Sequence, residues 1–392
     1  MTKNILIFEP DASGHHSGYL YHLIINFLSA NYHYNLTVLV APDFFEQHPQ
    51  IIEETLSPKV KWLAFSEAEF SAWKITKSES VTKRAFFEWD LLRKYITQTN
   101  ATYAFSMYID YLQIALLTQK ALPCPVSGIL FRPTLVNYPA HSLKEKLNTL
   151  RKNLTLKLFV KSKKLDSLFN LDPFATEYIK QNWQTSKVVF LPDPVQVYPS
   201  TKAVAEIKQE LGIEENRNVF LIFGFLDCRK GISEVMEAVG KISKENSQKG
   251  TLLIVGPWEE SEKLKFDKKL KEIEGISDFQ IITQNTFIAD HDIQPYFEVS
   301  DYILALYDKH IGMSAITVRA AAAQKPLLTY NFGLMGKIVV ENELGLIVNN
   351  DLSEKIEMLL MQKVVIGNKQ KMKQYAELNR AENYAKVILN SF

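Results

Sequence analysis

Short apolar runs alternate with longer segments of helical periodicity along the whole chain. In the first half the apolar runs lie at residues 4–8, 36–40, 103–107, 126–130, 165–171 and 188–191. In the second half they lie at residues 219–224, 251–255, 279–282, 302–306, 326–329 and 345–348. Continuous apolar runs separated by helical segments are typical of parallel sheets with crossover helices. The pattern therefore predicts an α/β protein with two doubly wound parallel sheets.

A proline-rich segment separates the two series of strands. Pro192, Pro194 and Pro199 cannot continue a helix or a central strand, so this segment is expected to cross between domains. The predicted domains cover residues 1–192 and 193–367. A chain of 392 residues also exceeds the length that one hydrophobic core usually supports, which favours two domains.

Composition and charge narrow the class of protein. Hydrophobic residues make up 46% of the chain and charged residues 23%, as in ordinary soluble globular proteins. The formal net charge of +1 argues against bulk electrostatic binding to nucleic acid. Cys124 and Cys228 match no metal-ligand spacing, so we expect neither a zinc site nor a disulfide framework, and the cytoplasm is the expected compartment. The N-terminal apolar run is too short for a signal peptide, and no run approaches the roughly 18 apolar residues of a membrane span.

Residues 222–235 place two adjacent cations immediately before a predicted helix. The apolar strand ends at Gly224, and Arg229 and Lys230 follow it before the helical segment. Free N–H groups at a helix start favour negative charge, and cationic side chains add charge-assisted hydrogen bonds. The segment therefore predicts a diphosphate site in which Arg229 and Lys230 stabilise the charge on a leaving group. The alternative is an Arg-Lys pair on the surface with no ligand.

Three later segments extend the pattern of the second half. They read LLIVG at 252–256, YFEVSDYIL at 296–304 and IGMSAITVRAAAAQKP at 311–326. Together with the segment from Gly224 to Lys230, they resemble in order and spacing the donor-binding half of retaining GT-B glycosyltransferases of family 4. This family is also called glycosyltransferase group 1. The resemblance covers most of residues 218–348.

The resemblance implies a fold, an activity and a set of site residues. The fold is GT-B, in which two Rossmann-like domains face each other across a cleft and a C-terminal helix, here 368–392, packs back onto the first domain. The activity is transfer of a sugar from a nucleoside diphosphate sugar to an acceptor hydroxyl, with retention and with neither a metal nor another cofactor. The acceptor is a carbohydrate, a lipid-linked molecule or a small molecule. The implied donor-binding residues are Gly14, Gly224, Gly256, His310, Gly312, Met313, Ser314, Thr317 and Arg319.

The chain departs from the family pattern at two donor-site positions. Where the family usually has two glutamates eight positions apart, this chain has Ile311 and Arg319. Neither side chain can accept a hydrogen bond from a sugar hydroxyl. Arg319 is expected to face the nucleotide pocket and bind a phosphate or an acidic sugar, or else to pair with a local carboxylate. The departure keeps an alternative function open, that of a catalytically inactive GT-B-like binding or scaffold subunit. An epimerase on the same fold lacks an assignable carboxylate cluster.

The first domain has candidates in three loops. The loop at 9–19 carries His15 and His16, which could bind sugar hydroxyls or move a proton, or could simply cap a helix. By the resemblance, Asp110 lies where the family often has a histidine near the transferred sugar, and a helix N-cap is the alternative. Arg132, before a proline turn, is an acceptor-side candidate for an anionic group, or part of a structural salt bridge.

Residues 143–164 combine a leucine stripe with many cations. Leucines recur at 143, 147, 150, 154 and 158 among lysines and arginines, with Glu145 the only acid. The pattern favours a domain helix whose leucines lie in the core and whose basic face is solvated. The alternative is a helix that lies on anionic lipid, which would place the protein peripherally on the inner membrane face.

Overall fold

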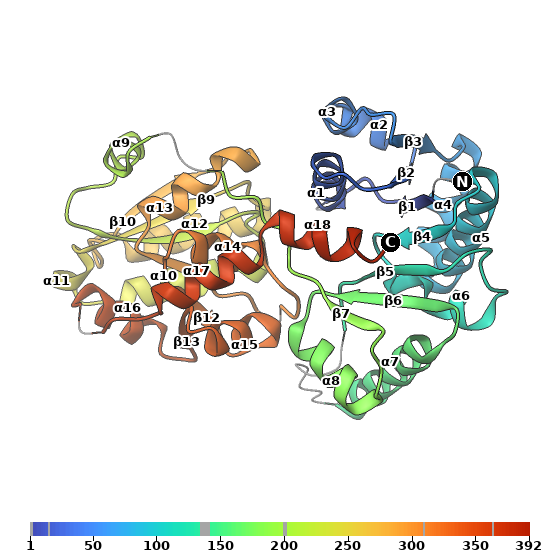
Figure 1. Cartoon of the computed structure of the whole chain (residues 1–392). Helices are drawn as coiled ribbons and strands as arrows, with labels where there is room; N and C mark the ends of the chain where they lie inside the picture. The colour runs from blue at the N-terminus through green and yellow to red at the C-terminus, as the bar shows by residue number, and fades with distance from the viewer. Residues whose placement is uncertain (1–2, 15, 134–141, 199–201, 309, 363) are drawn as a thin grey trace. The chain divides into compact units, whose positions relative to one another are not determined.

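The computed structural model describes residues 3–14, 16–133, 142–198, 202–308, 310–362 and 364–392. These residues form two compact units, and each is an α/β layer structure built on one parallel sheet (Figure 1). Unit 1 contains Met1–Pro194 and Ala381–Phe392, and unit 2 contains Val195–Arg380.

Unit 1 is built on a seven-stranded parallel sheet in the order β3-β2-β1-β4-β5-β6-β7. The strands are β1 (Lys3–Glu9), β2 (Tyr34–Val40), β3 (Val60–Ala64), β4 (Tyr103–Ser106), β5 (Val126–Leu130), β6 (Leu165–Asn170) and β7 (Val188–Phe190). The helices are α1 (His16–Ser29), α2 (Phe44–Gln47), α3 (Pro49–Glu54), α4 (Glu67–Glu79), α5 (Val81–Thr99), α6 (Gln113–Thr118), α7 (Leu143–Lys161), α8 (Pro173–Trp183), α18 (Ala381–Leu389) and the 3₁₀ turn η1 (Asp110–Leu112).

Both faces of the unit 1 sheet are buried, which explains the continuous apolar runs in its strands. Along β1, Leu6 and Phe8 enter a core shared with α5, α6 and the end of α7. Ile5 and Ile7 alternate with them and enter the opposite core, which includes α1 and α18. This alternation follows from the two-residue period of a strand.

Unit 2 is built on a six-stranded parallel sheet in the order β10-β9-β8-β11-β12-β13. The strands are β8 (Asn218–Phe223), β9 (Gly250–Val255), β10 (Gln280–Gln284), β11 (Tyr302–Ala305), β12 (Leu327–Tyr330) and β13 (Gly345–Val348). The helices are α9 (Val204–Glu210), α10 (Ile232–Lys241), α11 (Lys244–Ser247), α12 (Glu260–Ile273), α13 (Gln294–Val299), α14 (Ala315–Ala322), α15 (Gly333–Glu341), α16 (Leu352–Leu360), α17 (Lys369–Leu378) and the 3₁₀ turns η2 (Cys228–Lys230) and η3 (Asp290–Asp292).

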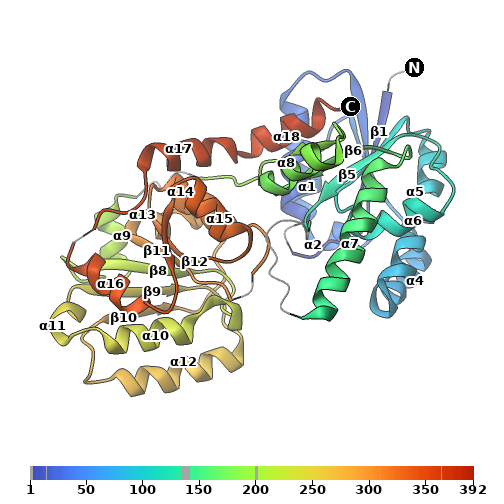
Figure 2. The same cartoon turned by 90° about the horizontal axis from the view of Figure 1, so that it is seen from below.

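The structure differs from the predicted elements and domain boundaries in three places. The edge strand β3 was not predicted, because Lys61 interrupts its short apolar run. The units divide after Pro194, whereas the predicted boundary followed residue 192. The segment 368–392 is not one helix on the first domain: α17 packs against α14 in unit 2, and only α18 packs against α1 in unit 1 (Figures 1 and 2).

The expectation that the leucine stripe of α7 lies in the core is wrong. All five leucines of the stripe are exposed. Leu156, Phe159 and Val160 of the same helix are buried instead. Among the helices of the described residues, none has the length and apolar character needed to cross a bilayer.

The strand order places one point of reversal in each sheet. In unit 1, β1 lies between β2 and β4, and in unit 2, β8 lies between β9 and β11. Ligands of doubly wound sheets bind at the carboxyl ends of the strands at such a point. The loops that follow β1 and β4, and those that follow β8 and β11, are therefore the places where functional side chains are expected.

Candidate functional site

Lys230 is held at the point of reversal in unit 2. It ends η2, two residues before α10 begins, and only 9% of it is exposed. Its ammonium donates hydrogen bonds to the carbonyl oxygen of Phe223 at 2.8 Å and to the hydroxyl of Tyr307 at 2.7 Å. The Nζ atom also lies 4.3 Å from the centroid of the Tyr307 ring. Because an ammonium has three hydrogens, one remains for a ligand.

Two glycines make this arrangement possible. Gly224 follows β8 with φ +107°, and a Cβ there would lie 3.2 Å from Nζ of Lys230. Gly256 follows β9 with φ +137°, and a Cβ there would lie only 2.0 Å from the carbonyl oxygen of Gly224. Both positions therefore require glycine, through backbone conformation and through close approach. Gly224 leaves room for the ammonium, and Gly256 leaves room for the backbone of Gly224.

Arg229 is held differently from its neighbour. Its guanidinium donates to one carboxylate oxygen of Asp227 through Nε at 2.9 Å and Nη2 at 2.6 Å. The other carboxylate oxygen of Asp227 accepts the backbone N–H of Arg229 at 3.0 Å. The Arg229 side chain is 55% exposed, so a ligand can reach it. Asp227 was not among the predicted site residues, although an aspartate two residues before the arginine is a recognisable signal for this local turn.

The loop after β11 brings His310 beside Tyr307. The two rings make an edge contact with centroids 5.5 Å apart. Nε2 of His310 lies 3.2 Å from the carbonyl oxygen of Met313. Gly333, at the start of α15, supports this loop, because a Cβ there would lie 2.4 Å from the carbonyl oxygen of His310. Through Tyr307, the loop reaches the same point in the fold as Lys230.

The next three candidates have different surroundings. A Cβ at Gly312 would meet only Nε2 of His310, at 3.9 Å. Ser314 is the N-cap residue of α14, but its side chain accepts no hydrogen bond from the helix backbone. Thr317 is fully buried, and its hydroxyl has no partner among the described residues. Thr317 thus lies one turn into α14 in the interior of the unit, and its role in donor binding stays a prediction.

Arg319 is buried in α14, with 5% of the residue exposed. Its Nη2 forms an ion pair with the carboxylate of Asp290 in η3. The guanidinium was expected to bind a phosphate or an acidic sugar, or to pair with a local carboxylate. The structure shows the pair with a local carboxylate. Burial lowers the pKa of Arg319, and the charge of Asp290 opposes that effect. Nη1 has no partner in the part of the chain that the structure describes.

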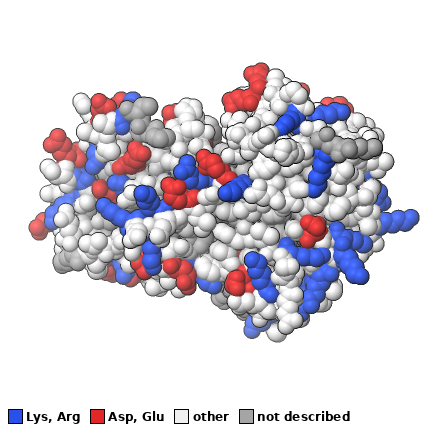
Figure 3. Space-filling view, in the orientation of Figure 1, with Lys and Arg blue, Asp and Glu red and all other residues white. Residues whose placement is uncertain are grey.

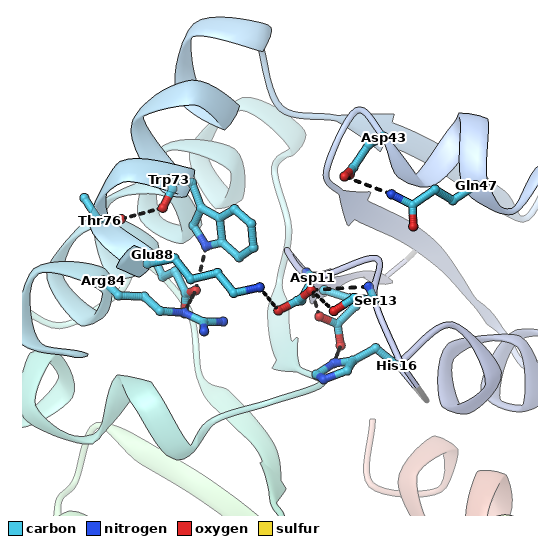
Figure 4. Close-up of polar contacts among 11 residues, drawn as sticks. Asp11, Ser13, His16, Asp43, Gln47, Trp73, Thr76, Arg84 and Glu88 are labelled. Atoms are coloured by element: carbon cyan, nitrogen blue, oxygen red, sulfur yellow. Dashed lines mark hydrogen bonds and ion pairs between the residues drawn. The ribbon is translucent and has the colours of Figure 1, made fainter. Parts of the chain in front are cut away.

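In unit 1, Glu9 at the end of β1 forms a pair with His16, which is labelled in Figure 4. Glu9 is 1% exposed, and its Oε2 lies 2.8 Å from Nδ1 of His16, which begins α1. Its other oxygen accepts the backbone N–H of Asp11 at 2.9 Å. Burial lowers the pKa of His16, but the hydrogen bond and charge of Glu9 outweigh it, so that pKa is raised. The other predicted histidine, His15, lies outside the described residues.

A buried ion pair that was not predicted from the sequence lies in the same region (Figure 4). Nε of Arg84 is 2.6 Å from Oε1 of Glu88, which also accepts the indole N–H of Trp73 at 2.8 Å. The Arg84 guanidinium lies 3.9 Å from the ring centroid of Tyr111. Burial raises the pKa of Glu88, and the charge of Arg84 opposes that rise. An i,i+4 pair usually indicates a solvated helix face, so the burial of this pair could not be predicted from its spacing.

A cavity of about 400 Å³ opens beside these residues. Of the residues that line it, Asp11 accepts from Lys77 at 2.5 Å, and Asp43 accepts from the Gln47 amide at 3.1 Å. The Oδ1 atom of Asp43 is buried without a partner in the described structure, and burial raises the pKa of this carboxyl. The lining residues are Asp11, Ala12, Ser13, Asp43, Gln47, Trp73, Lys74, Lys77 and Ser78.

Asp110 joins two loops of unit 1. Its carboxylate accepts the backbone N–H groups of Phe131 and Arg132, each at 3.0 Å. Burial raises the pKa of Asp110 to about 6, with the two backbone hydrogen bonds opposing the rise. The carboxylate thus ties the loop after β4 to the end of β5, and does not cap its own helix. Arg132 itself is exposed.

The comparisons with known proteins agree with this organisation. Residues 203–379 match the family model described as "Glycosyl transferases group 1". The matched residues lie within unit 2. A comparison with curated protein sequences finds no match. Among the described residues, no group of three or more His, Cys, Asp or Glu side chains is placed to hold a metal ion.

The similarity to solved structures extends beyond the residues that match the family model. HepE from Anabaena, in complex with UDP and glucose, is 13% identical with a TM-score of 0.66, and the match covers 99% of each chain. Sucrose-phosphate synthase from Thermosynechococcus elongatus is 14% identical with a TM-score of 0.64, covering 99% of this chain and 94% of that one. A glycosyltransferase from Rickettsia africae is 13% identical with a TM-score of 0.63, covering 100% and 97%. These likenesses show that the fold is GT-B.

Proposed function

We propose that the protein transfers a sugar from a nucleoside diphosphate sugar to an acceptor hydroxyl, with net retention as in family 4. The observation that carries the proposal is the buried ammonium of Lys230, held at the carboxyl edge of the sheet in a group 1 domain. HepE, which has the same fold, was solved with UDP and glucose. A uridine diphosphate sugar is therefore the first donor to test.

On the donor side, the two cations would act on the leaving diphosphate. Lys230 is already fixed by two hydrogen bonds, so it can meet developing negative charge without reorganising. The exposed guanidinium of Arg229 can add a second charge-assisted contact while Asp227 holds its backbone. The loop of His310, Gly312 and Ser314 would contribute polar groups from the neighbouring strand end. Arg319 is committed to Asp290, and we assign it a positioning role for η3.

On the acceptor side, the cavity of unit 1 offers groups that suit a hydroxyl-rich ligand. Asp11 and Asp43 supply acceptors and Lys77 a donor, while Trp73 provides an apolar ring against which a sugar can pack. His16 would hydrogen-bond a hydroxyl or move a proton, with Glu9 holding its orientation. The acceptor would accordingly be a carbohydrate, free or attached to a lipid or other small molecule.

A screen against nucleotide sugars tests the proposal directly. Uridine, guanosine and adenosine diphosphate sugars would each be added to the purified chain, with the melting temperature and the release of nucleotide as readouts. A donor that binds the native state must raise the apparent stability, by RT ln(1 + [L]/Kd). Nucleotide release that depends on an added acceptor would support transfer. Binding of no member of the panel would contradict the proposal.

The second candidate is a binding or scaffold subunit without catalysis. It is favoured by Ile311 and Arg319 at the positions where the family usually has glutamates, and by the commitment of Arg319 to Asp290. Such a subunit could bind a nucleotide sugar without turning it over. A melting temperature raised by a donor, with no nucleotide release under any acceptor condition, would favour this candidate over the enzyme.

A further inference from the structure

Helix α7 of unit 1 presents its leucine stripe to solvent. The exposed fractions are 81% for Leu143, 66% for Leu147, 65% for Leu150, 57% for Leu154 and 53% for Leu158. The whole first turn and a half of the helix is exposed, from residue 142 to residue 148. Figure 2 shows the helix running out from the sheet of unit 1. Monomeric proteins rarely leave so regular an apolar row in water, so it indicates a binding surface.

The helix has two apolar faces, and they point in opposite directions. At about 100° per residue, the five leucines fall within an arc of about 80°. The buried residues Leu156, Phe159 and Val160 lie on the other side of the helix, where they enter the core of unit 1. The core contact therefore fixes the orientation of α7 and leaves the leucine stripe facing outward.

Cations border the stripe on both sides. By the same angular spacing, Lys144 and Arg151 lie along one border, and Lys146 and Lys157 along the other. Long cationic side chains in this position can cover an apolar stripe with their stems while their charges reach a polar layer. Figure 3 shows Lys and Arg side chains gathered on the part of unit 1 where α7 lies. This is the arrangement of a helix that lies in a membrane interface.

Within the described part of the chain, acidic side chains compensate few of these charges. The one acid, Glu145, forms a capping box with Ser142 at the start of the helix. Of the cations in 143–164, Lys164 donates to the carbonyls of Leu116 and Gln119 at the end of α6. The ion pairs found among the described residues include none of the other basic side chains of this segment, which are Lys144, Lys146, Arg151, Lys152, Lys157, Lys161 and Lys163.

The charge decides between two kinds of occupant. A second copy of the chain would bury the leucines by pairing α7 with α7, but it would place Lys144, Lys146 and Arg151 against the same cations with only Glu145 to offset them. An anionic lipid surface offers both a hydrocarbon layer for the leucines and phosphate groups for the cations. We propose that α7 docks unit 1 on an anionic lipid bilayer. This surface does not depend on the proposed sugar transfer.

Vesicle sedimentation of the full chain tests the proposal without any donor. The vesicles would be phosphatidylcholine alone, or equal parts of phosphatidylcholine and phosphatidylglycerol. Wild type should sediment with the anionic vesicles and not with the neutral ones, and added salt should release it. The double variant Leu147→Ser, Leu150→Ser should bind about tenfold more weakly with an unchanged melting temperature. Leu264→Ser is the matched control, since Leu264 is 66% exposed on α12 in unit 2.

Three outcomes would overturn the proposal. Wild type could fail to sediment with anionic vesicles, or the double leucine variant could bind them as tightly as wild type. The third is a dimer in sedimentation velocity that the leucine changes dissociate while vesicle binding is absent, which would identify a second copy as the occupant. Because no nucleotide sugar is present in the assay, failure here leaves the proposed sugar transfer untouched, and failure of the donor screen leaves this surface untouched.

Discussion

The substitution Lys230→Met removes the buried charge while keeping a side chain of similar length. If the free ammonium hydrogen binds a diphosphate oxygen, the change removes one charge-assisted hydrogen bond, which contributes about 1.5–3 kcal/mol. Since about 1.4 kcal/mol corresponds to tenfold in affinity, UDP should bind roughly 10- to 150-fold more weakly. The carbonyl oxygen of Phe223 also loses its partner, so the free energy of unfolding should fall by about 1–3 kcal/mol.

Calorimetric titration with UDP, together with thermal melts, separates the two effects. Arg229→Met should weaken UDP binding and leave the melting temperature nearly unchanged, because this side chain is 55% exposed. Lys241→Met is the control, as Lys241 is an exposed lysine at the end of the same helix α10. The double substitution Arg229→Ala, Lys230→Ala should abolish detectable binding. A folded Lys230→Met protein with wild-type affinity for UDP would refute the assignment of Lys230 to the diphosphate.

Three further predictions concern unit 1. Leu150→Ala should change the free energy of unfolding by less than about 0.5 kcal/mol. Leu156→Ala, at a site that is 4% exposed, should lower it by about 2–5 kcal/mol. Equal losses for the two variants in urea melts would contradict the orientation of α7. Burial raises the pKa of Asp193 from 3.8 to about 6, so this carboxyl stabilises the fold below pH 3.8 and that contribution is lost as the pH rises through about 6. Asp193→Asn should make the free energy of unfolding depend less on pH. An unchanged pH dependence would contradict the raised pKa of Asp193. Glu9→Gln should lower the pKa of His16, measured by NMR titration, because it removes the charge that raises it; a pKa equal to that of wild type would exclude the pairing.

The sequence predicted the central strands well because their side chains are buried on both faces of the sheet. Every apolar run that was expected to be a strand overlaps one, and the missed strand β3 is an edge strand whose Lys61 faces solvent. The orientation of α7 could not be predicted, since the helix carries two apolar faces and periodicity does not say which one meets the core. That choice depends on the sheet surface beneath Phe159.

The candidate site was predictable only where its parts are close in sequence. Arg229 and Lys230 stand beside a glycine turn, so local spacing revealed them. The partner that fixes Lys230 is Tyr307, 77 residues later, and the link arises only when β8 and β11 pair. The Arg84–Glu88 pair is local, but its burial against Trp73 is set by the packing of α4 on α5.

The division of unit 1 between the two ends of the chain has a consequence for biosynthesis. Unit 2 is one continuous stretch, whereas unit 1 needs α18, whose Tyr384 is fully buried in the core with α1. Domains generally fold as units during synthesis, in the order in which they emerge from the ribosome. Residues 195–380 of unit 2 are all synthesised before α18. Residues 1–194 cannot complete the core of unit 1 until α18 has been synthesised. The first residues to be translated would therefore be the last to become native, and in the interval the surface of α1 that α18 later covers is open to a chaperone.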